Sequence, residues 1–414
     1  MPVSEIVTVG DEILRGERVN TNAAFIGNSL AEIGIPARWI TVVGDDIDEI
    51  QRAVHTAVER ADVVMVTGGL GPTPDDMTKD ALAKLFDMPL VEDQGLLEHV
   101  QERFLKRGAQ MPETSRNQAM FPRGAGQLPN PYGTAAGIHI ERNGRHVVSL
   151  PGVPREMEQM MSESVVPILA TAFPDSQVIT KTLRLADIGE SQVMFRLGDL
   201  SDMQRDIEMA FLPNFGMLDL RLTARSKDVH EAHTQIAGAE SRIREVIGDH
   251  VYATGDVPLA DVLGNVLVNR GQKAAVAESC TGGLIADMLT DAAGASRWLE
   301  RTWVTYSNES KAEDLGVDPD LIAQAGAVSE EVATAMAEGA RVVARTGWGL
   351  ATTGIAGPSG GTEAKPVGTV WIAVSSARRT TARLLHLDGD RRRVKLRAAH
   401  ALLFLFYRRL MDEH

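Results

Sequence analysis

The chain has 414 residues, of which 44% are hydrophobic and 24% charged. At roughly 150 residues per domain, this fits a globular protein of two or three domains and excludes a disordered chain. The formal net charge of −14 argues against a general attraction to nucleic acid or to an anionic membrane. The single cysteine, Cys280, excludes a disulfide framework, and no stretch approaches the roughly 18 uncharged apolar residues of a membrane span. These features predict a cytoplasmic protein.

The first third of the chain alternates apolar strands with amphipathic helices. We expect strands at 5–9, 38–43 and 62–66, and helices at 22–33 and 48–60. This alternation predicts an α/β fold in which a parallel sheet is covered by helices on both faces. Ligands of such sheets bind beyond the carboxyl ends of the strands.

Acidic residues follow two of these strands. Asp11 and Glu12 come after the first strand, and Asp75 and Asp76 lie in the glycine-rich stretch GGLGPTPDDMTKD at 68–80. Glycines allow the backbone to approach a phosphate, and a hard divalent cation binds carboxylate oxygens together with substrate phosphates. The residues therefore indicate a cation and phosphate site, and a solvated acidic turn is the alternative interpretation.

The remaining chain divides into a small α+β part and a second α/β part. We expect strands at 177–185, 217–224 and 273–277, and helices at 190–197, 230–247, 259–270, 284–289 and 394–410. The predicted domains are an N-terminal domain at 1–172, a middle domain at 173–250, a linker at 251–258 and a C-terminal domain at 259–414.

The junction ESCTGG at 278–283 connects an expected strand to an expected helix. Exposed backbone N–H groups and the positive end of the helix dipole surround such a turn. Ser279 would then be an exposed hydroxyl beside donors that can stabilise an oxyanion. In the alternative interpretation, Ser279 and Thr281 only cap the helix.

Three further segments carry reactive or charged side chains. Tyr306 and Lys311 stand five residues apart in WVTYSNESK, at the end of a strand, and residues 350–366 open from a strand into a glycine-rich loop. Arg391 begins the last helix, where the dipole disfavours a cation unless an anion binds there. In the alternative interpretation, Lys311 is a solvated surface lysine, Tyr306 belongs to the core and Arg391 is an ordinary surface charge. The glycines would then serve only the turns.

Residues 259–414 resemble the C-terminal domain of the CinA (competence/damage-inducible) family, which is a nicotinamide-nucleotide amidase. The similar stretches, in the order of the family, are AESCTGG, VTYSNESK, GAVSEEVATAMAEGA, TTGIAGPSGGTEAKPVGTVWIA and GDR. The resemblance implies hydrolysis of the carboxamide of nicotinamide mononucleotide to nicotinic acid mononucleotide and ammonia, without a metal or other cofactor.

The same resemblance implies roles for individual residues. Ser279 matches the nucleophile and Lys311 the general base, and Tyr306, Thr353 and Arg391 match other residues of the site. Serine at its ordinary pKa needs an adjacent base, and no histidine lies in these motifs. A lysine serves if burial or a neighbouring positive charge lowers its pKa.

Substrate contacts are expected from the same turn and from the last helix. The backbone of Thr281, Gly282 and Gly283 would hold the oxyanion, and Arg391 would bind the substrate phosphate through paired donors. Cys280 is a rival nucleophile, although a small buried packing role fits it better.

Residues 1–170 resemble the N-terminal domain of the CinA family, which is related to the molybdopterin-binding domains of molybdenum-cofactor synthesis proteins. The similar stretches are GDEILRGERVNTN, VTGGLGPTPDDMTKD, NPYGTAAG and LPGVPREM. The resemblance implies a metal-dependent ADP-ribose pyrophosphatase that uses magnesium, manganese or cobalt. The residues that would handle the metal are Asp11, Asp75 and Asp76, and those that would contact the substrate are Asn22, Lys79 and Arg155.

The middle domain resembles the KH-like segment of the same family. It has no G-x-x-G loop, so direct contact with nucleic acid is not expected. The resemblance implies a homodimer that acts on small nucleotides in pyridine nucleotide salvage. Two alternatives stay open: an N-terminal domain that only binds a pterin or nucleotide, and an interaction protein of DNA uptake or repair.

Overall fold

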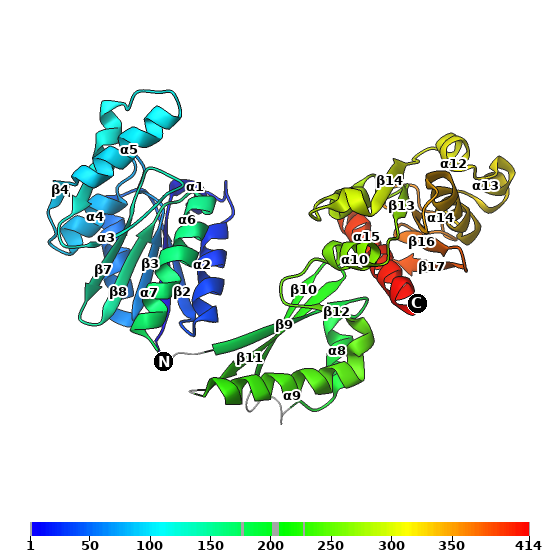
Figure 1. Cartoon of the computed structure of the whole chain (residues 1–414), viewed down its shortest axis with the longest axis horizontal. Coiled ribbons are helices and arrows are strands. Elements are labelled where there is room, and N and C mark those ends of the chain that lie inside the picture. The colour runs from blue at the N-terminus through cyan, green and yellow to red at the C-terminus, as the bar shows by residue number, and fades with distance from the viewer. Residues whose placement is uncertain (1, 175–177, 201–206, 227, 414) are drawn as a thin grey trace. The chain divides into compact units, whose positions relative to one another are not determined.

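The computed structural model describes residues 2–174, 178–200, 207–226 and 228–413 (Figure 1). The chain forms two compact units, residues 1–179 with 224–233 and residues 180–223 with 234–414. Within the described residues, no helix combines the length and the apolar character that crossing a membrane requires.

The N-terminal domain is built on a six-stranded sheet with the order β2-β1-β3-β8-β7-β6. Its strands are β1 (Ser4–Val9), β2 (Ala37–Val43), β3 (Val63–Thr67), β6 (Gly126–Leu128), β7 (Gly137–Arg142) and β8 (Arg145–Leu150). A separate two-stranded sheet pairs β4 (Leu90–Glu92) with β5 (Met120–Pro122). The helices are α1 (Asp11–Leu14), α2 (Thr21–Glu32), α3 (Ile47–Arg60), α4 (Thr78–Leu85), α5 (Gln94–Lys106), α6 (Pro154–Met160) and α7 (Val166–Ala172). A 3-10 helix (Glu113–Ala119) and a π-helical turn (Met161–Val165) complete it.

The expected α/β fold is confirmed, with one correction to the sheet. Strands β2, β1, β3 and β8 are parallel, whereas β7 and β6 add antiparallel strands at one edge. The turn between β7 and β8 is Asn143-Gly144, and both residues have positive φ. An Asn-Gly pair is a strong hairpin signal, because such a turn needs positive φ at both positions.

The middle sheet has the order β10-β11-β9-β12. It consists of β9 (Val178–Ala186), β10 (Ile207–Asn214), β11 (Met217–Arg225) and β12 (Val251–Thr254), with helices α8 (Glu190–Leu197) and α9 (Val229–Ile247). The expected linker at 251–258 therefore begins with a strand that pairs antiparallel with β9. Val251 and Tyr252 are buried there, which explains why this stretch joins the sheet. Residue 177, expected to begin a strand, lies outside the described residues.

The C-terminal domain has a five-stranded sheet with the order β14-β13-β15-β16-β17. Its strands are β13 (Ala274–Glu278), β14 (Leu299–Val304), β15 (Trp348–Gly354), β16 (Thr369–Ser376) and β17 (Thr380–His386). Its helices are α10 (Leu259–Asn269), α11 (Leu284–Thr290), α12 (Asn308–Leu315), α13 (Pro319–Ala325), α14 (Glu330–Ala344) and α15 (Arg391–Asp412). Strands β14, β13 and β15 are parallel, so their carboxyl ends meet at one edge.

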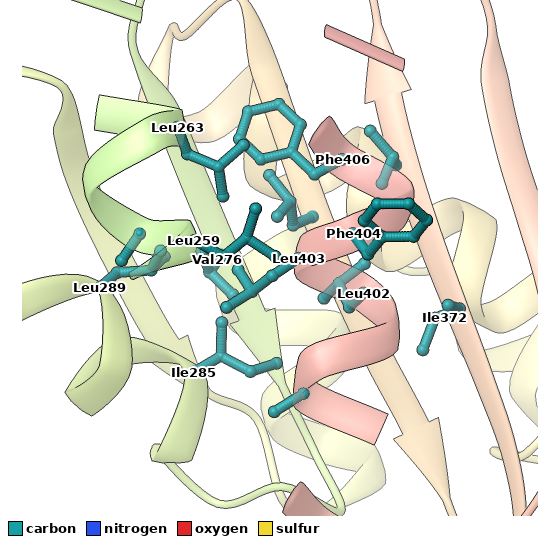
Figure 2. Packing of buried hydrophobic residues seen from close by; sticks show 14 of the residues in the cluster. Leu259, Leu263, Val276, Ile285, Leu289, Ile372, Leu402, Leu403, Phe404 and Phe406 are labelled. Carbon is teal, nitrogen blue, oxygen red and sulfur yellow. The ribbon is translucent and has the colours of Figure 1, made fainter. Parts of the chain in front are cut away.

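The two faces of this sheet carry side chains of different size. Large residues such as Val276, Leu350 and Ile372 pack against α10, α11 and α15. Figure 2 shows this face, with Leu402, Leu403 and Phe406 of α15 directed at the sheet and at α10. The opposite face is lined by alanines, which are Ala275, Ala277, Ala351 and Ala373, and it packs against the alanines of α14.

Small residues let α14 approach the sheet and α12 very closely. A Cβ on Gly349 of β15 would overlap the carbonyl oxygen of Ala337, and a Cβ on Gly339 of α14 would overlap the carbonyl oxygen of Leu315. Because Leu315 ends α12, the glycine at 339 determines how deeply that helix sits.

We predict that Gly349→Ala destabilises the C-terminal domain by at least about 2 kcal/mol, because its methyl group must displace the backbone of α14. The matched control is Gly347→Ala, where the nearest atom to the new Cβ lies at 3.8 Å. Urea unfolding followed by tryptophan fluorescence measures both variants. Equal midpoints for the two variants would contradict the close packing.

Candidate active site

The N-terminal domain has a pocket of about 120 Å³ beyond the carboxyl ends of β1 and β3. Asn22 is buried at this pocket and donates from Nδ2 to Thr67 Oγ1 at 3.0 Å and to the Gly152 carbonyl at 2.9 Å. Its Oδ1 is buried without a hydrogen-bond partner. An unsatisfied buried oxygen costs free energy, so a donor from a ligand would stabilise this site.

The acidic residues expected to handle a metal lie close together but are not assembled as ligands. Asp11 pairs with Arg15 at 2.6 Å, and Asp76 accepts hydrogen bonds from Thr73. Burial raises the pKa of Asp45, and the nearby carboxylates of Asp11, Glu12 and Asp75 raise it further. Within the ranges that the structure covers, no group of three or more His, Cys, Asp or Glu side chains could hold a metal ion.

The two expected cationic substrate contacts of this domain point elsewhere. Lys79 is buried and donates to the Asn117 carbonyl, and burial lowers its pKa to about 8. Arg155 is exposed and stacks over the ring of Tyr132 at 5.9 Å. Only Asn22 among the expected substrate contacts lines the pocket.

In the C-terminal domain, Ser279 and Lys311 form a hydrogen-bonded pair at the carboxyl edge of the sheet. The Lys311 Nζ lies 3.2 Å from Ser279 Oγ. The amino group also donates to the carbonyls of Thr305 at 2.8 Å, Ser307 at 3.2 Å and Tyr306 at 3.4 Å. The structure thus places the hydroxyl and the amine within hydrogen-bond reach of each other, which a serine nucleophile activated by a base would require.

Lys311 is almost fully buried, with 1% of its surface exposed. Burial lowers the pKa of this amine below the ordinary lysine value, although the nearby Cys280 and Glu309 act in the opposite direction. A neutral amine has two N–H groups, enough for two of these three carbonyls at a time, and a lone pair that can accept the serine proton. Lys311 therefore has the surroundings of a general base.

Two local expectations need correction here. Lys311 lies on α12 and not at the end of a strand, because Ser307 caps this helix by accepting from Ser310 N–H. Ser279 is mostly buried, with 8% of its surface exposed, and its backbone N–H donates to the Thr352 carbonyl at 3.0 Å.

The carboxylate of Glu278 occupies the start of α11. It accepts from the backbone N–H groups of Gly283 at 2.9 Å, Ile285 at 3.2 Å and Ala286 at 2.8 Å. Neither Ser279 nor Thr281 caps the helix, so that interpretation is wrong. Of the three amides expected to hold an oxyanion, the Gly283 N–H donates to Glu278 and the Gly282 N–H donates to the Ser279 carbonyl at 3.2 Å. Among the described residues, this leaves the amides of Cys280 and Thr281 in the turn.

Thr281 and Thr353 have structural partners. Thr281 is fully buried and shares a hydrogen bond of 2.8 Å with the Thr352 hydroxyl. Thr353 donates to the Ala327 carbonyl at 2.7 Å and so ties β15 to the loop before α14. Neither hydroxyl has Ser279 or Lys311 as its partner.

Arg391 connects the first turn of α15 to two loops of the site. It donates to the Gly357 carbonyl at 2.6 Å and to the hydroxyl of Tyr306 at 2.9 Å. Tyr306 is 62% exposed, so its ring is open to a ligand. The helix N-terminus itself is capped by Asp390, which accepts from Arg393 N–H.

Cys280 does not fit the role of a nucleophile. Burial raises the pKa of its thiol to about 12, so the thiolate is scarce at neutral pH. Its side chain belongs to the apolar cluster between the sheet and α15.

Comparisons with known proteins agree along the whole chain. A "CinA-like protein" of Gemmatimonas aurantiaca is 44% identical over 403 residues, which is 96% of this chain and 94% of that protein. A "putative competence-damage inducible protein" of Caldicellulosiruptor saccharolyticus is 39% identical over 97% of both chains. The chain belongs to the CinA family.

Three family models match consecutive parts of the chain. A probable molybdopterin binding domain matches residues 5–171, the damage-inducible protein CinA KH domain matches 180–253, and the CinA C-terminal domain matches 256–410. The solved structure of "the protein CinA with unknown function" from Thermoplasma acidophilum is 40% identical over 42% of this chain and 96% of that chain, with a TM-score of 0.36. The family assignment rests on the full-length relatives.

Sequence reasoning missed Glu278 as a member of this CinA-family site. The residue ends a strand that is otherwise apolar, AAVAE, and its burial is complete. A charged residue at the end of a buried strand, directly before a glycine-containing turn, is the signal that could have identified it.

Proposed function

We propose that the C-terminal domain is an amidase that hydrolyses the carboxamide of nicotinamide mononucleotide to nicotinic acid mononucleotide and ammonia. The observation that carries this proposal is the buried Lys311 amine at 3.2 Å from Ser279 Oγ. A serine paired with a lysine of lowered pKa suits acyl transfer from an amide.

The reaction begins when Ser279 Oγ attacks the carboxamide carbon while its proton passes to Lys311 Nζ. The tetrahedral oxyanion is held by the backbone N–H groups of Cys280 and Thr281, since the amides of Ser279 and Gly282 already donate to carbonyls of the chain. The C–N bond then breaks as Lys311 returns the proton to the leaving nitrogen, which releases ammonia and leaves a nicotinoyl ester on Ser279. Water attacks this ester, Lys311 takes its proton, and the carboxylate product leaves as Ser279 recovers its hydrogen.

Tyr306 and Arg391 act as a pair in this proposal. The exposed ring of Tyr306 offers a flat surface to a pyridine ring, and Arg391 holds its hydroxyl at 2.9 Å. Arg391 also holds the loop at Gly357, so a substitution of Arg391 disturbs both walls of the site.

We predict that Ser279→Ala lowers ammonia release from nicotinamide mononucleotide by at least about 10³-fold, because the attacking oxygen is removed. Cys280→Ala is the matched control and keeps the wild-type rate, since its thiol is buried and protonated. Wild-type activity should survive EDTA. A folded wild-type protein that releases no ammonia would overturn the proposed amidase.

We predict that kcat/KM rises with pH as Lys311 loses its proton, because only the neutral amine accepts a proton. The lowered pKa moves this rise below the ordinary lysine pKa of about 10.4. Lys311→Arg keeps the charge but cannot lose its proton, so it should lower the rate by about 10²- to 10⁴-fold. A Lys311→Arg variant with the wild-type rate and pH profile would refute the assignment of the base.

We infer a second activity for the N-terminal domain, hydrolysis of ADP-ribose or a related nucleotide. The observation in its favour is the pocket with the unsatisfied Asn22 Oδ1, at the edge of the sheet where the carboxylates gather. Within the part of the chain that the structure describes, the side chains alone do not form a ligand group for a metal. Magnesium often takes only one or two carboxylates together with substrate phosphates, and Asp75 is an exposed carboxylate suited to that use.

We predict that ADP-ribose is hydrolysed with magnesium, manganese or cobalt and is left intact with EDTA. Asp75→Asn should lower the rate by about tenfold or more, because one charge that favours the cation is lost. Asn22→Ala should weaken ADP-ribose binding, measured by calorimetry. Glu17→Gln, on an exposed residue outside the pocket, is the control for charge. Binding without hydrolysis would support the alternative of a binding module.

Nicotinamide mononucleotide and ADP-ribose both arise from the breakdown of NAD. An enzyme that carries both proposed activities in one chain would therefore act in pyridine nucleotide salvage. The homodimer and the absence of direct nucleic-acid contact stay predictions. A role in DNA uptake or repair through a protein partner is the remaining alternative to the enzymatic proposal.

A further inference from the structure

Lys395 is a cation beside the nucleophile turn that the mechanism above does not use. It lies on α15 one turn after Arg391, and its Nζ is 3.4 Å from the position that a Cβ on Gly282 would take. Its charge acts on the neighbouring Cys280 thiol and lowers the pKa of that group, against the stronger effect of burial. The ammonium group is therefore within the electrostatic reach of the Ser279 turn.

The ammonium of Lys395 is also uncommitted. Among the residues that the structure describes, it has neither a hydrogen-bond acceptor nor a carboxylate partner, although the side chain is half-buried. Its neighbours on the helix differ in this respect, because Arg391 donates to Gly357 and Tyr306, and Arg397 donates to the Asp388 carbonyl. A partly desolvated cation without a partner favours an anion from outside the chain.

The nearest alternative place for an anion is already filled. The first amides of α11 would ordinarily attract a phosphate, but they donate to the buried Glu278 carboxylate. A phosphate there would meet a like charge. Arg391 and Lys395 lie on one face of α15, since positions four apart share a helix face. The N-terminus of this helix is itself capped by Asp390, so the two side chains, and not the helix end, supply the positive charge.

We propose that Lys395 binds the 5′-phosphate of the mononucleotide and is the residue that selects a nucleotide over its nucleoside. Arg391 donates to Tyr306 and to the Gly357 carbonyl, so its main role is then to hold these two loops in place. This inference rests on the proposed amidase activity, because it assigns one contact of the same substrate.

The test compares nicotinamide mononucleotide with nicotinamide riboside, which lacks the phosphate. We expect Lys395→Gln to lower kcat/KM for the mononucleotide by about 10- to 100-fold through KM, the usual effect of losing a contact to a charged group. The value for the riboside should stay within about twofold of wild type. Lys395→Arg should recover most of the loss, because it restores a cation on a long side chain.

Arg392→Gln is the matched control. Arg392 is an exposed cation in the same turn of α15, and its removal changes the net charge equally. Inorganic phosphate provides a second readout, since it should inhibit the wild-type enzyme competitively and the Lys395→Gln variant much less.

Several outcomes would overturn this assignment. If Lys395→Gln lowers kcat/KM equally for the mononucleotide and the riboside, Lys395 acts at the reacting carboxamide and not at the phosphate. If Arg392→Gln lowers kcat/KM as much as Lys395→Gln does, the effect comes from net charge and not from a specific contact. If the wild-type enzyme is active and Lys395→Gln still prefers the nucleotide, the role of Lys395 is refuted and the proposed amidase is not. No ammonia from either wild-type reaction refutes the proposed amidase itself.

Discussion

The buried amino group of Lys311 is the constraint around which the C-terminal domain is arranged. An amine loses much of its hydration on burial, so the fold must supply acceptors or leave the group neutral. It supplies the carbonyls at 305–307 and the Ser279 hydroxyl. These acceptors need the end of β14 and the start of α12 in fixed positions, and the glycine at 339 lets α12 sit close enough to α14. The packing of small residues far from the serine therefore determines whether the Lys311 amine reaches the Ser279 hydroxyl.

A second buried ionisable side chain, Glu278, fixes the turn at Ser279 and fills the start of the following helix. By accepting three amides at the start of α11, it stabilises the tight turn that presents Ser279. It also occupies that helix end, which is why the proposed phosphate contact falls on a side chain of α15. The buried thiol of Cys280 between these groups stays protonated because the same burial raises its pKa. In the proposed site, the reacting groups and the phosphate contact thus come from different elements of the C-terminal domain.

Both α/β domains place their functional side chains by the same rule, since the carboxyl ends of parallel strands converge at one edge. The two edges differ because the C-terminal domain buries Lys311 against Ser279, whereas the N-terminal domain keeps the acidic residues of its edge partly accessible to solvent. Burial and the neighbouring carboxylates raise the pKa of Asp45 there, and the buried Oδ1 of Asn22 accepts no hydrogen bond. That edge therefore retains an acceptor open to a donor from outside the chain, while Lys311 and Ser279 are hydrogen-bonded to each other.

The sequence by itself determined the α/β class, most strands and helices, and the residue types of both edges, because periodicity and glycine punctuation are local properties. It also contained the hairpin signal Asn143-Gly144, although the antiparallel edge strands were not predicted. Only the tertiary structure decided that 251–254 joins a sheet, since that pairing is with a strand more than 60 residues away. It alone brought Lys311 to Ser279, across 32 residues, and turned Glu278 onto the amides of α11. Such contacts depend on how closely helices pack on the sheet, which no local pattern encodes.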